Sequence, residues 1–303
     1  MSSSLLTVGS VAFDSIETRA GKRNEILGGA ATYISLCASM FAPVNLVGVI
    51  GDGDFPQEHI DMLTSKGINI SGLEKAPGKT FRWSGKYADD FSSRTTLDTQ
   101  LGVFEHFDPK IPAEYANPDI LMLGNIDPGL QAKILDTVGD SSYVITDTMN
   151  LWIDIALEKL KAVIRRTDLL VINDEESAML TGEMQVSAAA DKILADGPGA
   201  VIIKRGEHGA YLFTKDTVFF APAFPLKDVV DPTGAGDSFA GGLAGYLTQA
   251  ESTNDEAIKK GMIYGSAAAS HTCEDFGVEN LKNLQRPAVD ARFEQLRKLV
   301  SLK

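Results

Sequence analysis

The stretch DPTGAGDSFAGG at residues 231–242 combines two carboxylates with three residues that carry almost no side chain. Apolar residues at helical spacing follow, so Gly234, Ala235 and Gly236 are expected at a helix N-terminus. Such a terminus presents backbone amides and a partial positive charge, and small residues let an anion approach them. Asp237 comes next and, as a carboxylate, could take a proton from an alcohol. The motif indicates an anion hole beside a general base, whereas a plain turn and cap would explain only part of it.

The composition limits the partners that such a site can serve. Over 303 residues the formal net charge is -13 and the pI is near 4.8, which argues against a nucleic acid or an anionic membrane as partner. The first residues lack a basic segment followed by a long apolar one, so a cytoplasmic protein is expected. Cys37 and Cys273 are isolated and the histidines are scattered, so neither a disulfide scaffold nor a structural metal site is predicted.

Short apolar runs alternate along the chain with segments of helical spacing. The runs are expected to be strands buried on both faces, at residues 5–11, 44–50, 119–126, 142–148, 168–173 and 200–206. Helical spacing occurs near residues 29–41, 53–66, 128–139, 151–166, 186–196, 235–249, 255–274 and 288–302. This alternation predicts an α/β fold with a doubly wound, mostly parallel sheet flanked by helices.

Two stretches interrupt this alternation. Residues 79–98 alternate aromatic and polar side chains, which suits an exposed antiparallel hairpin with one apolar face. Phe81, Trp83 and Tyr87 are expected on one face of the strand. Arg82, Ser84 and Lys86 are expected on the other face. With residues 15–27 the hairpin is expected to form a small β-sheet lid, built from about 15–27 and 79–104 and inserted in a single domain. A plain surface hairpin is the alternative.

Further landmarks accompany the glycine motif in a set order. They are GSVAFD (9–14), GGAATYISLCAS (28–39), GVIGDGDFPQEHIDMLTSKGI (48–68), NDEE (173–176) and IKRGEHGAYLF (203–213). Together with DPTGAGDSFAGG they resemble the ribokinase-like (PfkB) family of carbohydrate and nucleoside kinases over essentially the whole chain. The resemblance implies a single ribokinase-like kinase domain over residues 1–303 that uses ATP and Mg2+.

The resemblance also implies roles for the glycine motif. Asp237 falls on the family's catalytic base, and Gly234, Ala235 and Gly236 fall on the anion hole that stabilises charge on the transferred phosphoryl group. Asp231 matches a loop that binds a monovalent cation, such as K+, in many members. The expected reaction is phosphoryl transfer to a primary hydroxyl.

Other positions match the family's nucleotide site. Asn173 and Glu176 match an N-x-x-E pair that helps place Mg2+ and the phosphates, with Glu176 acting through water. Taken alone, this pair predicts a helix capping box. Lys204 and Gly206 match the strand end that borders ATP, and His271 lies in a segment that matches part of the adenine pocket.

The acceptor side of the site matches with two departures. Asp14 falls on the family's substrate-binding aspartate, where a carboxylate can accept hydrogen bonds from two sugar hydroxyls. Gly28 and Gly29 fall on the di-glycine that lets substrate approach the backbone. Where ribokinases have asparagines, this chain has Ala12 and Tyr33, and both changes remove polar contacts to a free sugar.

Aromatic residues expected around Asp14 favour a nucleoside over a free sugar. A nucleobase can stack on an aromatic ring for about 1–3 kcal/mol in single-strand binding. The residues expected to supply this apolar surface are Phe13, Tyr33, Phe81, Trp83 and Phe104.

Alternatives to a nucleoside kinase remain open at this point. Arg82, Lys86 and Arg94 could bind the phosphate of a sugar phosphate such as fructose 6-phosphate, although parity predicts that Arg82 and Lys86 face solvent. A kinase for ribose or fructose, and a nucleotide-sensing protein without turnover, are further alternatives. A monomer or a homodimer formed through the lid is expected.

Overall fold

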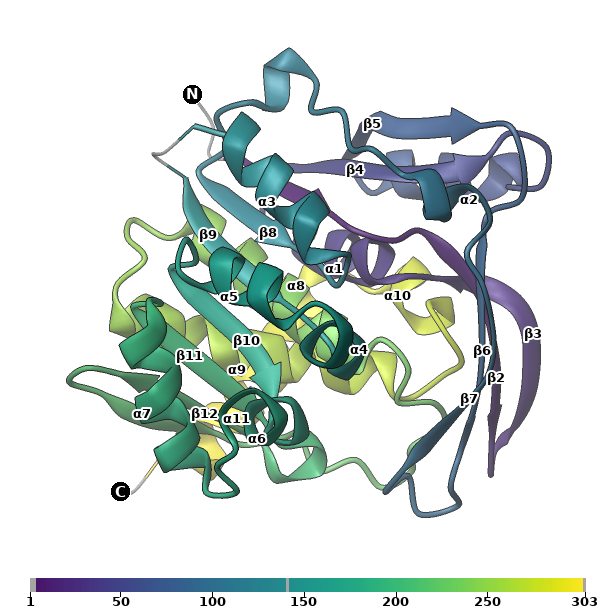
Figure 1. Cartoon of the computed structure of the whole chain (residues 1–303). Coiled ribbons are helices and arrows are strands. Elements are labelled where there is room, and N and C mark those ends of the chain that lie inside the picture. Colours follow the sequence, from purple (N-terminus) through teal and green to yellow (C-terminus); the bar gives the residue numbers. More distant parts are fainter. Residues whose placement is uncertain (1–3, 140–141, 302–303) are drawn as a thin grey trace.

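A mostly parallel sheet of nine strands forms the centre of the protein (Figure 1). The structure is a computed structural model that describes residues 4–139 and 142–301. The strands are Leu5–Val8 (β1), Val44–Gly51 (β4), Ile68–Ala76 (β5), Ile120–Leu123 (β8), Tyr143–Asp147 (β9), Leu169–Asn173 (β10), Ala200–Lys204 (β11), Ala210–Thr214 (β12) and Val218–Ala221 (β13). Their order across the sheet is β13-β12-β11-β10-β9-β8-β1-β4-β5.

The chain winds outward from β1 in both directions. It passes first to β4 and β5 on one side, and later crosses to β8, β9, β10 and β11 on the other, with parallel pairing throughout. Strands β12 and β13 at the far edge pair antiparallel. The predicted doubly wound, mostly parallel sheet is confirmed. The reversal of direction between β1 and β8 creates a switch point, and such sheets bind ligands outside the carboxyl ends of the strands there.

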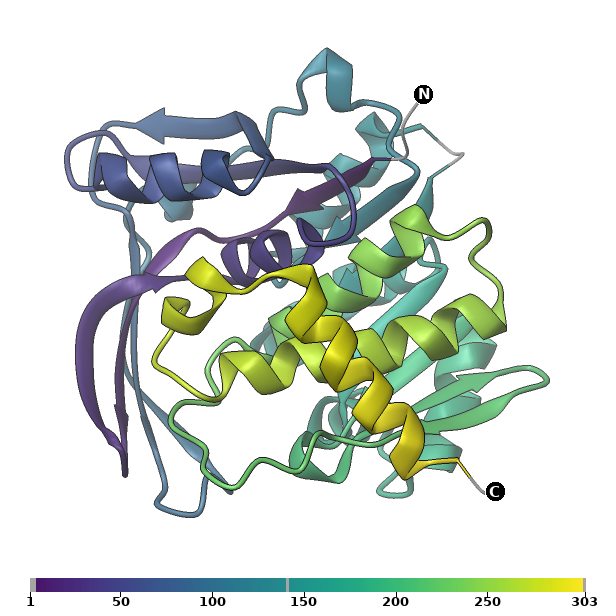
Figure 2. The ribbon, with the colours of Figure 1, turned by 180° about the vertical axis from the view of Figure 1, so that it is seen from behind.

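Helices cover both faces of this sheet. The face turned to the viewer in Figure 1 carries Pro128–Thr137 (α3), Asn150–Ile155 (α4), Leu157–Ile164 (α5), Asp174–Thr181 (α6) and Val186–Asp196 (α7). The other face, in front in Figure 2, carries Ala30–Ala38 (α1), Gln57–Ser65 (α2), Ala235–Gln249 (α8), Asp255–Thr272 (α9), Glu279–Asn283 (α10) and Arg286–Leu299 (α11). The sheet is therefore the middle of three layers.

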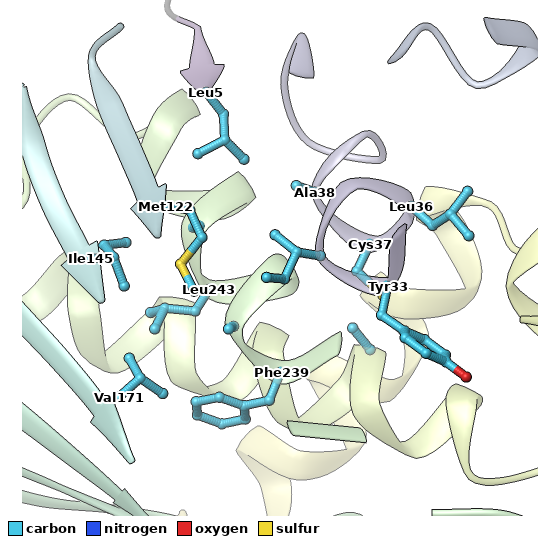
Figure 3. Packing of buried hydrophobic residues seen from close by; sticks show 14 of the residues in the cluster. Leu5, Tyr33, Leu36, Cys37, Ala38, Met122, Ile145, Val171, Phe239 and Leu243 are labelled. Carbon is cyan, nitrogen blue, oxygen red and sulfur yellow. The ribbon is translucent and has the colours of Figure 1, made fainter. Parts of the chain in front are cut away.

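Apolar side chains from neighbouring strands point toward the helices behind the sheet (Figure 3). Leu5, Met122, Ile145 and Val171 come from β1, β8, β9 and β10, and they share a buried cluster with Phe239 of α8. Two further apolar clusters fill the opposite face, beneath α3, α5 and α7. Burial on both faces explains why these strands read as continuous apolar runs in the sequence.

Helix α8 is fixed tightly between α1 and α9. A Cβ atom on Gly245 would lie 2.7 Å from the Cα of Ala38 in α1, closer than real Cβ atoms approach. A Cβ atom on Gly265 of α9 would lie 2.7 Å from the Phe239 carbonyl oxygen of α8. These glycines let the helix backbones touch, and this contact sets the position of the α8 N-terminus.

A second sheet of four strands stands at the side of the molecule (Figure 1). It consists of Ala12–Thr18 (β2), Gly21–Gly28 (β3), Phe81–Tyr87 (β6) and Arg94–Gln100 (β7), in the order β3-β2-β6-β7. Strands β6 and β7 form the antiparallel hairpin expected from residues 79–98, and β2 pairs in parallel with β6. The small sheet predicted from residues 15–27 and 79–98 is confirmed, and it is called the lid below.

The prediction that Arg82 faces solvent is wrong. Its side chain is only 19% exposed and pairs with Asp54 at 2.8 Å and with Glu25 at 2.7 Å. Its guanidinium also lies 5.2 Å from the centroid of the Phe13 ring. The outer face of the lid packs here against the turn after β4, which strand parity does not reveal. Lys86 is 57% exposed, as predicted.

A few elements differ from expectation. The helical region expected over 151–166 is divided into α4 and α5, because the backbone of Ala156 (φ -139°, ψ 28°) leaves the helical region. Strands β5, β12 and β13 and helix α10 were not expected as separate elements. Over residues 4–139 and 142–301, the longest apolar helices fall short of what a membrane crossing needs.

Replacing Gly245 with alanine is expected to destabilise the protein, although alanine favours helices by about 1 kcal/mol. The added methyl group would enter the α1 backbone, and overpacking of this kind costs about 1–3 kcal/mol. We expect Tm to fall by several degrees in a thermal melt. Gly53→Ala is the control, because no atom lies within 4 Å of its Cβ position. An unchanged Tm for Gly245→Ala would contradict the close helix contact.

Candidate active site

The glycine motif lies at the N-terminus of α8, as the sequence predicts. Gly234 is the N-cap residue with φ 74°, a left-handed conformation that favours glycine. A Cβ atom there would collide with the Tyr33 ring of α1, and one on Gly236 would lie 3.2 Å from Lys204 Nζ. Gly234 is therefore required by its close neighbour and by its backbone conformation, whereas Gly236 lies close to the end of the Lys204 side chain. With Ala235 between them, the first turn of α8 presents its amides with little side-chain cover.

Asp237 occupies the first turn of α8 beside these amides. Burial raises the pKa of Asp237 to about 7, and the negative charge of Asp147 adds to the rise. The positive charges of Lys204 and Arg94 act in the opposite direction. A carboxylate whose pKa lies near neutrality is well suited to accept a proton from an alcohol.

Lys204, at the end of β11, is the centre of a buried charge cluster. Its Nζ lies 3.5 Å from Asp147 Oδ1, at the end of β9, and both side chains are largely buried. Although burial lowers the pKa of Lys204, the charges of Asp147 and Glu176 raise it above its ordinary value. The ammonium group is therefore held in its charged form, close to Asp237.

Asn173 and Glu176 form the capping box that their spacing predicts. The Asn173 side chain accepts from the Glu176 amide at 2.7 Å, and Glu176 Oε2 accepts from the Asn173 amide at 2.8 Å. The box begins α6 at the end of β10, next to β11. Burial raises the pKa of Glu176 to about 7, with Lys204 opposing the rise. The pair thus caps a helix and also adds a carboxylate to the Lys204 cluster.

Asp147 is a site residue that the sequence analysis missed. It is 5% exposed, and burial raises its pKa although Lys204 acts against the rise. It ends β9 at the same sheet edge as Asn173 and Lys204. An aspartate directly after a buried parallel strand is the signal that could have identified it.

Asp14 of β2 lies against the di-glycine, where β3 ends and α1 begins. A Cβ atom on Gly28 would collide with the Asp14 carboxylate, and one on Gly29 (φ 90°) would lie 2.6 Å from the Ser10 carbonyl oxygen. Burial raises the pKa of Asp14 to about 7, with Asp231 and Asp237 adding to the rise and the Gly29 amide opposing it. Asp14 therefore belongs to the same electrostatic group as Asp237.

Tyr33 and Asp231 complete the interior of the site. Tyr33 is 1% exposed, and its hydroxyl has no hydrogen-bond partner among the described residues. Asp231 accepts from the Thr233 amide at 2.9 Å and from the Gly277 amide at 3.0 Å. The Thr233 hydroxyl in turn bonds the Tyr87 hydroxyl at 3.1 Å, which joins the glycine turn to the lid.

The lid aromatics divide into two groups. Trp83 stands opposite Asp14 in the β2–β6 register, and its indole lies over Gly85, where a Cβ atom would collide with it. Phe81 stacks on Phe104 at 5.4 Å between ring centroids, at the base of the lid, where Phe104 packs on an apolar cluster. Trp83 is thus the aromatic beside Asp14.

Three other expected positions have surroundings of a different kind. Phe13 packs on Phe55 at 5.5 Å on the outer face of the lid, so the expectation that it enlarges the pocket beside Asp14 is wrong. Its strand parity is opposite to that of Asp14. His271 lies at the end of α9, 3.5 Å from Glu274, where burial lowers its pKa to about 4. Gly206 is exposed in the turn after β11.

Solved structures share this fold. A nucleoside kinase of Methanocaldococcus jannaschii, an archaeal member of the ribokinase family, has 22% identity, with 97% of this chain and 99% of that chain covered and a TM-score of 0.77. A nucleoside kinase of Burkholderia thailandensis in complex with ADP-inosine has 21% identity, with 99% and 100% covered and a TM-score of 0.80. At these identities the likeness shows a ribokinase-type fold.

Sequence comparison identifies the family. The pfkB family carbohydrate kinase pattern matches residues 3–284. A cytidine kinase of Thermococcus kodakarensis is 33% identical over 250 residues, which cover 80% of this chain and 88% of that protein. The chain belongs to the pfkB family of carbohydrate kinases, and the predicted kinase activity is confirmed.

Replacing Asp14 with asparagine is expected to stabilise the protein in a pH-dependent way. Burial raises the Asp14 pKa from 3.8 to about 7, so the folded state binds more protons than the unfolded state between these values. The wild type therefore loses stability as pH rises from about 4 to 7, and Asp14→Asn removes this loss. We expect the gain in Tm to be several degrees larger at pH 8 than at pH 5. An equal gain at both pH values would show that Asp14 does not titrate in this range.

Proposed function

We propose that this chain is an ATP- and Mg2+-dependent nucleoside kinase that phosphorylates the 5′-hydroxyl of a ribosyl group. The observation that carries the proposal is Asp237 beside the glycine turn, close enough to Asp14 for its charge to raise the Asp14 pKa. The names of the relatives support a nucleoside acceptor, as the aromatic residues of the sequence suggested. The cytoplasmic location and the choice between a monomer and a lid-mediated homodimer stay predictions.

The chain's own groups account for the transfer. Asp14 would accept hydrogen bonds from two ribose hydroxyls, and the absence of a side chain on Gly28 makes room for the Asp14 carboxylate. Asp237 would take the proton of the 5′-hydroxyl while the 5′-oxygen forms a bond to the γ-phosphorus. The bond from this phosphorus to the β-bridging oxygen breaks, and ADP leaves with the electron pair. The amides of the glycine turn would stabilise the charge that develops on the phosphoryl oxygens.

The residues at the sheet edge fit ATP and Mg2+. Lys204 and the helix N-terminus offer positive charge to the phosphates, and the buried carboxylates of Asp147 and Glu176 offer oxygen ligands, through water, to the metal. Within the described residues no three His, Cys, Asp or Glu side chains gather as a direct metal cage, which suits an ion carried largely by phosphates and water. Bound Mg2+ would neutralise the phosphate charge. Asp231 would serve a monovalent cation such as K+.

The lid supports a nucleoside better than a sugar phosphate. Two of the three cations that could bind the phosphate of a sugar-phosphate acceptor are paired with carboxylates instead. Arg82 pairs with Asp54, and Lys86 pairs with Glu17. Trp83 offers an aromatic surface beside Asp14, where a base attached to the ribose would lie. Base stacking on such a surface is worth about 1–3 kcal/mol in comparable sites.

Asp237→Asn is expected to lower kcat by about 10²- to 10⁴-fold, the usual contribution of a positioned base. The amide cannot accept the hydroxyl proton, but it leaves the glycine turn and Lys204 in place. ATP affinity, measured by calorimetry, should therefore stay within a few fold of the wild type. A variant that keeps more than a tenth of the wild-type kcat would refute Asp237 as the base.

A panel of acceptors tests the substrate class. We expect the kcat/KM of at least one ribonucleoside among adenosine, inosine and cytidine to exceed that of ribose, fructose and fructose 6-phosphate, because the base adds contacts with Trp83. The measurement is ADP release under one set of conditions, with acceptor-free ATP hydrolysis as the control. A lead of tenfold or more for fructose 6-phosphate would reverse the conclusion in favour of a sugar-phosphate kinase.

A further inference from the structure

The cations of the lid differ in what they contact. Most are engaged within the lid or against its outer face: Lys22 and Lys86 with Glu17, Arg82 with Glu25 and Asp54, Arg19 over Phe91, and Arg23 over Phe276. Arg94, the first residue of β7, forms no ion pair with any carboxylate that the structure describes. Like Arg19 and Arg23, Arg94 therefore keeps a positive charge that no described carboxylate neutralises, and it differs from them in stacking on Trp83, the aromatic beside Asp14.

The register of the lid strands directs Arg94 toward the glycine turn. Arg94 pairs with Tyr87 across β6 and β7, and the Tyr87 hydroxyl bonds Thr233, the residue before Gly234. The Arg94 guanidinium lies 5.1 Å from the centroid of the Trp83 ring. Trp83 in turn stands opposite Asp14 in the β2–β6 register. Stacking on a rigid indole holds a guanidinium in a defined orientation.

Charge supports the same placement. Burial raises the pKa of both Asp14 and Asp237, and the positive charge of Arg94 acts against the rise in each case. Arg94 is thus close enough to influence the acceptor aspartate and the base together. In the proposed reaction the γ-phosphoryl group is transferred beside Asp237, which takes the acceptor proton, so a cation that acts on Asp237 lies near its path.

We propose that Arg94 is a catalytic residue supplied by the lid, and that its guanidinium contacts the phosphoryl group as it passes from ATP to the acceptor. The proposal rests on the function proposed above. The proton still goes to Asp237 and ADP still leaves with the electron pair, while Arg94 neutralises charge on the oxygens that face away from the glycine turn. A planar guanidinium suits this task because it donates two parallel hydrogen bonds to a phosphoryl group.

The location on the lid adds a consequence for specificity. The glycine turn and Lys204 belong to the main sheet layer, whereas Arg94 reaches the phosphoryl group only where β6 and β7 lie against the Thr233 turn. If water entered the site without an acceptor, Arg94 would assist phosphoryl transfer to it only when the lid was in place. Arg94 therefore couples acceptor enclosure to phosphoryl transfer.

The test compares Arg94→Ala and Arg94→Lys with Arg19→Ala, a control that removes another lid arginine stacked 5.1 Å from an aromatic ring. We expect Arg94→Ala to lower kcat by about 10²-fold or more. The KM for the acceptor ranked first by the panel should change less than threefold. Arg94→Lys should recover part of the loss, and Arg19→Ala should stay within twofold of the wild type.

A binding measurement separates catalysis from packing. ADP with aluminium fluoride, in the presence of the same acceptor, mimics the phosphoryl group in flight. Arg94→Ala should weaken this complex at least tenfold, while affinity for ATP without acceptor stays within threefold and Tm is unchanged.

Several outcomes would overturn the proposal. They are a kcat within threefold of the wild type, a loss confined to KM, or an unweakened aluminium fluoride complex. This complex needs no proton transfer, so it reports on Arg94 even if Asp237→Asn shows that another residue is the base. Failure of the base assignment and failure of the Arg94 assignment are therefore distinguishable.

Discussion

The structure depends on keeping several carboxylates buried close together around one glycine turn. Asp14, Asp147, Glu176 and Asp237 all have raised pKa values, with burial as the main cause. Such a group is stable only if cations and oriented amides lie close by. Lys204 provides one cation, and the N-terminus of α8 provides the amides. The remaining negative charge is partly protonated near neutral pH, or is neutralised when ligands bind.

The helices behind the sheet maintain this arrangement. Glycines in α8 and α9 let these helices and α1 touch through their backbones, so the α8 N-terminus cannot shift independently of the sheet. Tyr33 of α1 fills the space above Gly234, which links the acceptor side of the site to the anion-binding turn. An acidic protein can then hold anionic phosphates with few basic side chains, because backbone amides supply the field.

The lid contributes a different kind of constraint. Its outer face is anchored by Arg82 to Asp54, and its inner face meets the Thr233 turn through Tyr87. Trp83 and Arg94 lie between these anchors, next to Asp14. In the proposed mechanism, this one small sheet would enclose the acceptor, offer an aromatic surface to a base and bring a positive charge to the phosphoryl group.

The sequence by itself determined the layered α/β fold, the lid strands and the identity of most candidate site residues. Apolar runs and helical spacing are local signals, and the glycine motif can be recognised from its residue types and their spacing. Asp147 escaped notice because an aspartate at a strand end is a weak signal by itself, and the fold strengthens it by bringing Lys204 beside it. Arg82 and Arg94 share a hairpin, yet one anchors the lid and the other lies over Trp83. Only the tertiary structure decided this, because the packing partners come from distant parts of the chain.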